Sequence, residues 1–220
     1  GADVFVCGED FSSQIFFPSG GGQCVAFHSV VCREPEPFEL ALAGVHQAEN
    51  AALVIMAAKL LEREDVRVTE KAIRTALRTV RHPARFEILA NEGVPVVIDG
   101  AHNPAGMRAL RTGLDTYFPD LPRVFLLGIL KDKDIDTMLA ALLRPGDQVV
   151  TVRPNSERAA AVDVVAAVAA GMGLVTVACD DRAKGLDEAV RRAHVRSALL
   201  VVAGSLYLVG DIRAMLTAGR

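Results

Sequence analysis

The sequence has no tryptophan, and aromatic residues make up only 5% of its 220 positions. It contains no run of basic residues, and its formal net charge is −3. Proteins that bind nucleic acid hold the phosphates with clustered lysine and arginine and stack the bases on aromatic rings. The composition therefore gives no reason to expect nucleic acid as a partner and favours small molecules.

Cysteine is scarce and is not arranged for metal binding. The four cysteines, Cys7, Cys24, Cys32 and Cys179, form no CxxC pair and have no neighbouring pair of histidines. Neither a zinc site nor a disulfide framework is predicted, and we assign no metal ligand to this chain. Cysteines without pairing signals are typical of a reduced compartment, so we expect a cytoplasmic protein.

Long hydrophobic runs are absent as well. The most apolar helical stretch, Ala51–Leu61, is too short to span a bilayer, and the N-terminus lacks the basic region and apolar core of a signal peptide. We therefore expect no membrane association. The chain starts at Gly1-Ala2-Asp3 without a methionine and directly enters a short predicted strand, Val4–Cys7, so we expect a piece of a longer protein.

The first part of the chain is rich in β-type residues within a composition that is 51% hydrophobic and 23% charged, which is typical of globular proteins. Runs at Gln14–Phe17 and Cys24–Cys32 flank Pro18–Gly22, which predicts a hairpin turn. The glycines at 20–22 could instead be a phosphate-binding loop. The turn is favoured because a strand follows these glycines and no Gly-Lys-Ser/Thr is present.

The apolar period then becomes helical. It predicts helices over His46–Arg63 and Thr69–Val80, the second with Thr69 as its N-cap. His82-Pro83 breaks the pattern. We therefore predict a domain boundary here, with residues 1–82 before it and residues 83–220 after it.

Strands and helices alternate through the rest of the chain. The near-continuous apolar runs at Val124–Leu127 and Leu199–Val202 indicate a sheet that is covered on both faces. The predicted fold class is α/β, with a Rossmann-like, doubly wound and mostly parallel sheet. Strands are predicted at Phe86–Leu89, Val94–Ile98, Arg123–Leu127, Gln148–Val152, Leu174–Ala178 and Ala198–Val202, and helices at Pro104–Tyr117, Ile135–Leu143, Ala159–Ala170, Arg182–Ala193 and Leu206–Leu216.

Ligands of such sheets collect at the carboxyl ends of the strands. The turns after the strands that end at residues 98, 127 and 202 should therefore face one crevice, in which Asp99, Lys131 and Ser205 meet. At the first of these turns, Asp99 could accept hydrogen bonds from both hydroxyls of a ribose, beside His102 and Asn103 at a helix N-terminus that favours anions. The alternative is an ordinary strand-to-helix turn with Asn103 as N-cap and Pro104 as the first helical residue.

Five segments resemble folylpolyglutamate synthase and dihydrofolate synthase, which belong to the Mur ligase superfamily. Those enzymes join a carboxylate to an amine through an acyl phosphate made with ATP. The resemblance implies a Rossmann-like C-terminal domain preceded by the β-rich and helical tail of a central ATPase domain. The segments are Gly44-Val45-His46-Gln47-Ala48-Glu49-Asn50-Ala51-Ala52, Arg85-Phe86-Glu87, Asp99-Gly100-Ala101-His102-Asn103-Pro104, Gly128-Ile129-Leu130-Lys131-Asp132-Lys133-Asp134 and Gly204-Ser205-Leu206-Tyr207-Leu208-Val209-Gly210-Asp211-Ile212-Arg213.

The resemblance assigns three residues to ATP. Asn50 is similar to the asparagine that meets the adenine, Arg85 to the arginine that clamps the phosphates, and Asp99 to the aspartate that binds the ribose. The alternatives are a helix-surface amide for Asn50 and a solvated arginine beside Glu87 for Arg85. The chain has Ala84 where the family pattern has glycine, and alanine adopts positive φ at a higher cost, which puts the loop geometry in doubt.

The resemblance assigns three residues to L-glutamate. His102 is similar to the histidine near the transferred phosphate and the incoming glutamate, and with Arg85 it is a catalytic candidate; Ser205 and Tyr207 resemble the glutamate-binding pair. The alternatives are an N-cap for Ser205 and a core position for Tyr207. Lys133 and Asp134 are weaker candidates, because charged turns before helices are usually solvated.

The chain has no Gly-x-x-x-x-Gly-Lys-Ser/Thr, the loop that holds ATP phosphates and places a hydroxyl on magnesium. The resemblance implies that the ligands of Mg²⁺ and most of the folate pocket lie upstream, in an N-terminal ATPase domain that acts as a partner. We expect ATP, L-glutamate and dihydropteroate or a reduced folate as the substrates of the whole enzyme, and no turnover by this chain alone.

Two other functions stay open. A Mur ligase of peptidoglycan synthesis is disfavoured because the chain has no Asp-Asn-Pro-Arg-like motif, whereas Ser205-Leu206-Tyr207 matches the folate branch. A stand-alone, non-catalytic nucleotide-binding module would use the same crevice. An upstream reading frame with a phosphate loop would decide against that module.

Overall fold

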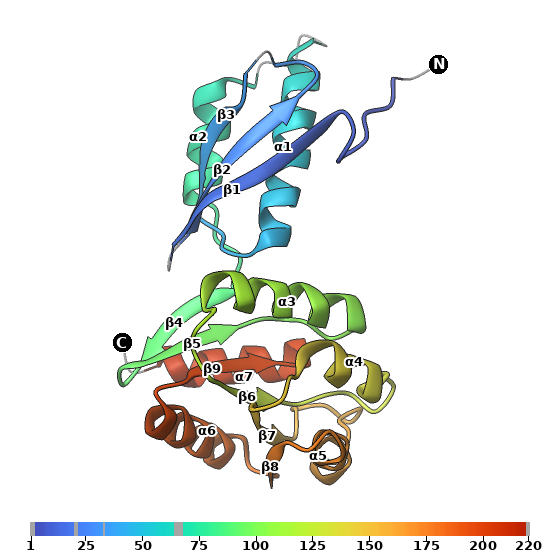
Figure 1. Cartoon of the computed structure of the whole chain (residues 1–220), viewed down its shortest axis with the longest axis vertical. Coiled ribbons are helices and arrows are strands. Elements are labelled where there is room, and N and C mark those ends of the chain that lie inside the picture. Colours follow the sequence, from blue (N-terminus) through green and yellow to red (C-terminus); the bar gives the residue numbers. More distant parts are fainter. Residues whose placement is uncertain (1–2, 20–21, 33, 64–67, 219–220) are drawn as a thin grey trace. The chain divides into compact units, whose positions relative to one another are not determined.

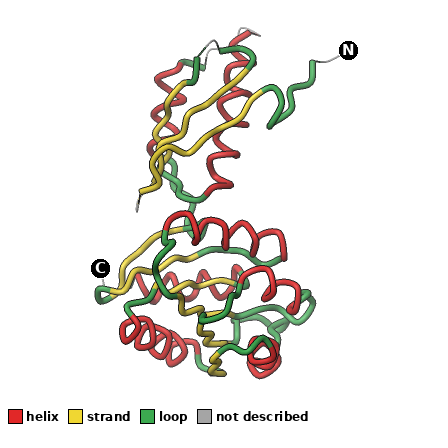
Figure 2. The backbone as a smooth tube through the Cα atoms, viewed as in Figure 1, coloured by secondary structure: helices red, strands yellow, loops and turns green. Residues whose placement is uncertain are grey.

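A computed structural model describes residues 3–19, 22–32, 34–63 and 68–218. The chain divides into two compact units, Gly1–His82 and Pro83–Arg220 (Figure 1). Each unit is built around its own sheet, as the strands in Figure 2 show.

The first unit is a three-stranded antiparallel sheet on which two helices pack. The sheet has the order β1-β2-β3, and its buried side chains form one apolar cluster with those of the helices, centred on Phe27, Phe38 and Ile55. Helix α2 begins after Thr69, whose hydroxyl accepts a hydrogen bond from Ala72 N–H at 3.2 Å, as predicted. The elements are β1 (Phe11–Ser19), β2 (Gly22–Ser29), β3 (Glu36–Leu40), α1 (Val45–Arg63) and α2 (Glu70–Thr79).

The predicted hairpin is present, because β1 and β2 pair up to Ser19 opposite Gly22. The turn residues 20–21 lie outside the described residues. The predicted strand Val4–Cys7 is wrong: Cys7 makes only an isolated bridge to Phe11, and Val4 is exposed. Strand β2 ends at Ser29, three residues before the predicted end, because the chain turns there.

Strand β3 is not among the predicted elements. It is short and contains proline, which weakens a strand signal. Its buried Phe38 and Leu40 nevertheless alternate with less buried neighbours, which is the period of a half-buried strand. That alternation was the available signal.

The second unit confirms the predicted fold class. Its six-stranded sheet has the order β4-β5-β9-β6-β7-β8, and only the pair β4–β5 is antiparallel. The strands are β4 (Glu87–Asn91), β5 (Val94–Ile98), β6 (Arg123–Leu127), β7 (Gln148–Val152), β8 (Val175–Cys179) and β9 (Leu199–Ala203). The helices are α3 (Pro104–Tyr117), α4 (Ile135–Leu142), α5 (Val162–Gly171), α6 (Arg182–Arg196) and α7 (Leu206–Thr217).

Helices cover both faces of this sheet. Helices α3, α4 and α5 follow one another on one face, and α6 and α7 lie together on the other (Figure 1). Every residue of β6 and β9 is buried, which explains why these strands read as continuous apolar runs. Helix α5 begins at Val162 rather than at the predicted Ala159, because Ala159 forms a β-bridge with Leu130.

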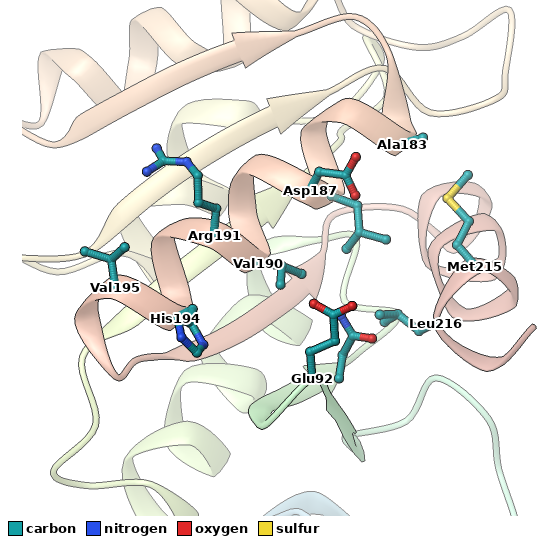
Figure 3. Close-up of a pocket in the computed structure, with 11 residues that line it drawn as sticks. Glu92, Ala183, Asp187, Val190, Arg191, His194, Val195, Met215 and Leu216 are labelled. Carbon is teal, nitrogen blue, oxygen red and sulfur yellow. The ribbon is translucent and has the colours of Figure 1, made fainter. Parts of the chain in front are cut away.

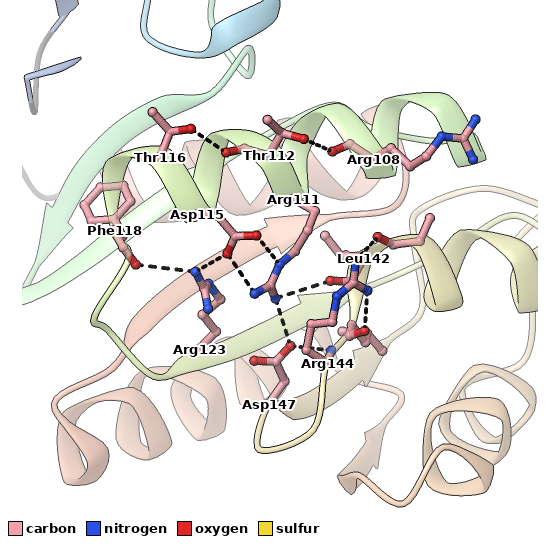
Figure 4. A network of polar contacts seen from close by, with 12 residues as sticks. Arg108, Arg111, Thr112, Asp115, Thr116, Phe118, Arg123, Leu142, Arg144 and Asp147 are labelled. Carbon is pink, nitrogen blue, oxygen red and sulfur yellow. Dashed lines mark hydrogen bonds and ion pairs between the residues drawn. The ribbon is translucent and has the colours of Figure 1, made fainter. Parts of the chain in front are cut away.

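A network of ionic contacts braces the amino-terminal end of the sheet (Figure 4). Arg111 on α3 contacts Asp115 at 2.8 Å and Asp147 at 3.4 Å, and Arg123 at the start of β6 contacts Asp115 at 2.7 Å. Burial raises the pKa of Asp147, against the opposing effects of the Arg144 N–H and the nearby arginines. Arg123 begins β6 and Asp147 directly precedes β7, so the network stands at the opposite end from the strand carboxyl termini.

None of the described helices combines the length and the hydropathy that a membrane span needs. All four cysteines are free thiols.

Candidate functional site at the carboxyl ends of β5, β9 and β6

Three neighbouring strands end at one edge of the second sheet, and the turns that follow them are bonded to each other. Asp99 N–H donates to Val202 O at 3.0 Å, and Gly128 N–H donates to Ala203 O at 3.3 Å. Gly204 N–H donates to Ala101 O at 3.0 Å. The turns after β5, β9 and β6 therefore form one continuous surface, as predicted from the strand pattern.

This close approach depends on Gly204, whose φ is +112°. A Cβ at this position would lie 2.7 Å from Gly128 O, a backbone atom that cannot move aside. A side chain at position 204 would therefore separate the turns after β9 and β6.

Asp99 follows β5 at the centre of this surface and is only 5% exposed. Its Oδ1 accepts a hydrogen bond from Ala101 N–H at 2.8 Å, and its Oδ2 accepts one from Phe86 N–H at 2.8 Å. The carboxylate thus joins its own turn to the loop that precedes β4. Any ribose hydroxyl would have to use the remaining lone pairs of these oxygens.

That loop carries Arg85 between two residues with positive φ, Ala84 at +60° and Phe86 at +46°. Alanine does adopt the conformation that the family pattern gives to glycine. The Phe86 ring is buried against α3, with its centroid 5.3 Å from that of Tyr117. A Cβ on Gly113 would lie 2.5 Å from the Phe86 ring, so this glycine makes room for it.

The Arg85 guanidinium lies over the turn after β5. Its Nη1 is 3.5 Å from the position that a Cβ would take on Gly100. Within residues 3–19, 22–32, 34–63 and 68–218, no side chain or carbonyl pairs with it by a hydrogen bond or an ion pair. A half-buried guanidinium without a protein partner can bind an anionic ligand with both arms of its fork.

The alternative interpretation of Arg85 was a solvated arginine beside Glu87. Glu87, the first residue of β4, does not pair with Arg85. Its Oε2 accepts a hydrogen bond from Ala84 N–H at 2.9 Å, and its carboxylate pairs with Arg213 of α7 through contacts of 2.8, 2.9 and 3.1 Å. Burial alone would raise the pKa of Glu87. The hydrogen bonds from Arg213 and Ala84 outweigh burial and hold this pKa below its ordinary value.

His102 is half-buried at the start of α3. Its Nδ1 lies 2.8 Å from Gly100 O, which can only accept, so Nδ1 carries the proton. In the neutral form of the ring, this leaves a lone pair on Nε2. Asn103 accepts a hydrogen bond from Gly106 N–H at 2.8 Å and Pro104 follows it, so the predicted cap of α3 is confirmed.

Ser205 is the N-cap of α7. Its hydroxyl accepts a hydrogen bond from Leu208 N–H at 3.1 Å, and the residue is 1% exposed. The structure therefore supports the capping interpretation of Ser205, whereas a direct contact to glutamate stays a prediction. Tyr207 is exposed rather than in the core. The hydrogen bond and the charge of Asp132 raise the pKa of the Arg158 guanidinium, and nearby Tyr207 adds a smaller effect in the same direction.

The turn after β6 is tied to the loop after β7. Lys131 N–H donates to Arg158 O at 2.8 Å, and Asp132 accepts two hydrogen bonds from the Arg158 guanidinium. Lys133 contacts Asp132 at 3.9 Å, and Asp134 caps α4 through Thr137 N–H at 3.1 Å. Lys131 is thus bonded through its backbone to the loop after β7, and its meeting with Asp99 and Ser205 stays a prediction.

Asn50 belongs to the first unit, where it is exposed on α1. Its Nδ2 donates to Gln47 Oε1 at 3.4 Å, and Gln47 in turn lies 2.9 Å from His46 Nε2. These three side chains form a polar row at the start of the helix.

The second unit therefore brings together Arg85, Asp99, His102 and Ser205, and sequence reasoning missed the Glu87–Arg213 pair that stands behind them. Both residues lie within the segments that carry the family resemblance, but their separation of 126 residues hides their contact. Across the described residues, no cluster of three or more histidine, cysteine or acidic side chains could hold a metal ion.

A hollow of about 640 Å³ in the second unit lies elsewhere (Figure 3). It is lined by α6, the β4–β5 turn and the end of α7, including Glu92, Val190, His194 and Met215. These are the amino-terminal end of β5 and the carboxyl end of α7, the reverse of the ends that carry Asp99 and Ser205. None of the predicted site residues lines it.

Comparison with known proteins agrees with this geometry. Residues 84–206 match the family described as "Mur ligase, glutamate ligase domain". The chain belongs to the Mur ligase family. The matched range begins with the Arg85 loop and ends at the start of α7, so it includes Arg85, Asp99, His102 and Ser205 and stops one residue before Tyr207.

Curated relatives include a probable bifunctional folylpolyglutamate synthase/dihydropteroate synthase of Halobacterium salinarum, 38% identical over 81% of this chain and 21% of its own length. The dihydrofolate synthase/folylpolyglutamate synthase of Bacillus subtilis is 30% identical over 82% of this chain and 41% of its own length. The folylpolyglutamate synthase of Mycobacterium tuberculosis, solved with ADP and AMPPCP, superimposes with a TM-score of 0.81 at 27% identity, covering 96% of this chain and 49% of that one. This Mur ligase chain spans less than half the length of these relatives.

Proposed function

We propose that this chain is the C-terminal portion of a dihydrofolate/folylpolyglutamate synthase, an ATP-dependent ligase that adds L-glutamate to dihydropteroate or a reduced folate. Its relatives carry these names and match most of the chain. In the whole enzyme, ATP would activate the folate-side carboxylate as an acyl phosphate, which the amine of glutamate then attacks. A cytoplasmic location stays a prediction from the cysteine pattern.

The observation that carries the proposal is the guanidinium of Arg85, which lies above the turn that holds His102 and has no partner in the part of the chain that the structure describes. Both groups lie at the start of α3, where backbone N–H groups and the helix dipole favour negative charge. The arrangement suits a transferred phosphate and the charge that develops when the amine attacks. His102 bears a proton at Nδ1, and the neutral form of its ring would offer Nε2 as an acceptor without adding charge.

The remaining assignments stay proposals that rest on the resemblance. Asn50 would meet the adenine, Asp99 the ribose, and Ser205 with Tyr207 the glutamate. Asp99 and Ser205 are buried, and the side chain of each already accepts hydrogen bonds from backbone N–H groups. This supports a role for both in positioning the turns of the site. Exposed Tyr207 is the more accessible of the glutamate pair.

Mg²⁺ and the phosphate loop would be supplied by an N-terminal ATPase domain. The described residues of this chain offer no cluster of metal ligands, so the chain's own share of the chemistry is cationic and hydrogen-bonding. ATP, L-glutamate, the folate and that domain are therefore the proposed partners.

Two alternatives are separated by substrate. A peptidoglycan Mur ligase belongs to the same family, but the curated relatives carry folate names. A stand-alone nucleotide-binding module would bind ATP without ligation.

The test is a ligation assay with the full-length polypeptide that carries this chain. We expect ATP-dependent addition of glutamate to dihydropteroate or tetrahydrofolate, and a loss of about a hundredfold in kcat/KM in Arg85→Met. Arg108→Met, which removes an exposed arginine of α3, is the matched control and should retain activity. Binding of ATP without ligation of any folate would contradict the proposal.

A further inference from the structure

The loop that carries Arg85 is held in a conformation that its own residues disfavour. Ala84 and Phe86 have φ values of +60° and +46°, although neither is glycine. Positive φ is disfavoured for both residues because it brings the Cβ close to a backbone carbonyl oxygen. The loop therefore needs contacts from outside itself to keep this geometry.

Two carboxylates supply these contacts, one on either side of Arg85. Glu87 Oε2 accepts the Ala84 N–H at 2.9 Å, and Asp99 Oδ2 accepts the Phe86 N–H at 2.8 Å. Ala84 O in turn accepts the Gly100 N–H at 2.8 Å. Both peptide groups that flank Arg85 are thus fixed.

Glu87 is also the acid nearest to Arg85 in sequence, two positions away, and it is a potential partner for its guanidinium. Arg213 prevents that pairing by occupying Glu87 with its own planar fork, at distances of 2.8, 2.9 and 3.1 Å. Arg213 projects from α7, the helix that Ser205 caps, so it links the Arg85 loop to the turn after β9.

We propose that Arg213 is a positioning residue that keeps Glu87 away from Arg85 and thereby leaves the Arg85 guanidinium available for an anionic ligand. This inference rests on the proposed function for its kinetic readout. Without Arg213, the Glu87 carboxylate would turn to Arg85 and form an ion pair with it. The Arg85 guanidinium would then no longer be available for a phosphate.

The test compares Arg213→Met with the double variant Arg213→Met/Glu87→Gln in the full-length ligase. The single variant should lower kcat/KM for ATP by about tenfold, the size of one lost charge-assisted interaction. The double variant should recover most of this loss, because a glutamine side chain at position 87 cannot neutralise Arg85 and its amide oxygen can still accept the Ala84 N–H. The control is Arg182→Met, which removes the ion pair between Arg182 of α6 and Asp211 of α7 at 3.2 Å. It should leave kcat/KM for ATP unchanged.

A readout independent of ligation is the rate at which phenylglyoxal modifies Arg85, followed by mass spectrometry in the same preparations. We expect slower modification in Arg213→Met than in the parent and the parent rate in the double variant. This measurement keeps the inference testable if the parent protein ligates no glutamate, which would overturn the proposed function alone.

A purely structural part for Arg213 predicts a different result. The double variant would then be no more active than Arg213→Met, and the modification rate of Arg85 would not follow the charge at position 87; either outcome overturns the inference. If Arg213→Met does not fold in a thermal melt, Arg213→Lys, which keeps the charge and loses the fork, should lower kcat/KM by about threefold. Unchanged kinetics in Arg213→Lys would then overturn the inference.

Discussion

The carboxylate of Asp99 accepts the backbone N–H of Phe86 at 2.8 Å, across 13 positions of sequence. A single buried aspartate therefore ties the turn after β5 to the loop that carries Arg85. The residue that the family resemblance assigns to a ribose is also part of the frame of the site.

Replacing Asp99 by alanine should lower the free energy of unfolding by about 3 kcal/mol. The backbone N–H groups of Ala101 and Phe86 would lose their acceptors while staying buried. Urea denaturation measures this loss. The matched control is Asp136→Ala on the exposed first turn of α4, which should lower the free energy of unfolding by less than about 1 kcal/mol. Asp115 on α3 is unsuitable as a control position because its side chain belongs to an ion-pair network.

The same Asp99→Ala protein tests the ribose contact in the full-length enzyme. If Asp99 binds the ribose, affinity for ATP should fall by about 2–4 kcal/mol, and affinity for an analogue without ribose hydroxyls should fall much less. Isothermal titration with both nucleotides gives the comparison. If the affinities for the two nucleotides fall equally, Asp99 positions the Arg85 loop and does not contact the ribose.

Ala84→Gly should stabilise the protein by about 1 kcal/mol. The backbone at position 84 has φ +60°, which glycine adopts without the penalty that a Cβ brings. Ala90→Gly, on the neighbouring strand β4, should instead destabilise, because a strand residue gains nothing from this freedom. Chemical denaturation of both variants shows whether the strain at Ala84 is real; a destabilised Ala84→Gly would argue against it.

Ser205→Ala separates capping from glutamate binding. Loss of the hydrogen bond to Leu208 N–H should cost about 1 kcal/mol of stability. A glutamate contact would in addition raise the KM for glutamate by about tenfold and leave the KM for ATP unchanged. Asp181→Ala, which removes the cap of α6, is the matched control for the stability effect without a kinetic one.

The Glu87–Arg213 pair should make stability depend on pH in the acid range. The pKa of Glu87 in the folded protein lies below its ordinary value of 4.5, so its stabilisation is complete above that pH and is lost as the pH falls through the folded value. The difference in unfolding free energy between the parent and Glu87→Gln should therefore be largest at neutral pH. It should shrink below about pH 4.5, and a difference that grows on acidification would have the wrong sign.

The 220-residue chain by itself should show no ATPase activity above background, because it lacks the phosphate-loop motif. A phosphate-release assay with ATP, folate and glutamate measures this. Folate- and glutamate-dependent release of phosphate would show that the chain needs no further domain.

Much of the fold was readable from the sequence because its signals are local. In the second unit, the apolar runs of β6 and β9 mark strands buried on both faces, and Asn103-Pro104 marks the start of α3. In the first unit, Thr69 marks the start of α2 through a contact three residues away. The turns after β5, β9 and β6 were expected together because parallel strands end at one edge of a sheet.

Tertiary structure decided what these turns do with their side chains. Whether Asp99 and Ser205 face a ligand or the backbone depends on burial, and whether Glu87 pairs with Arg85 or with Arg213 depends on a contact across 126 residues. Even the positive φ of Ala84 comes with hydrogen bonds to Glu87 of β4 and from Gly100 of the turn after β5, against the preference of alanine itself. Local periodicity in the sequence predicts the helices and strands. The partner of a charged side chain depends on the packing that brings distant elements together.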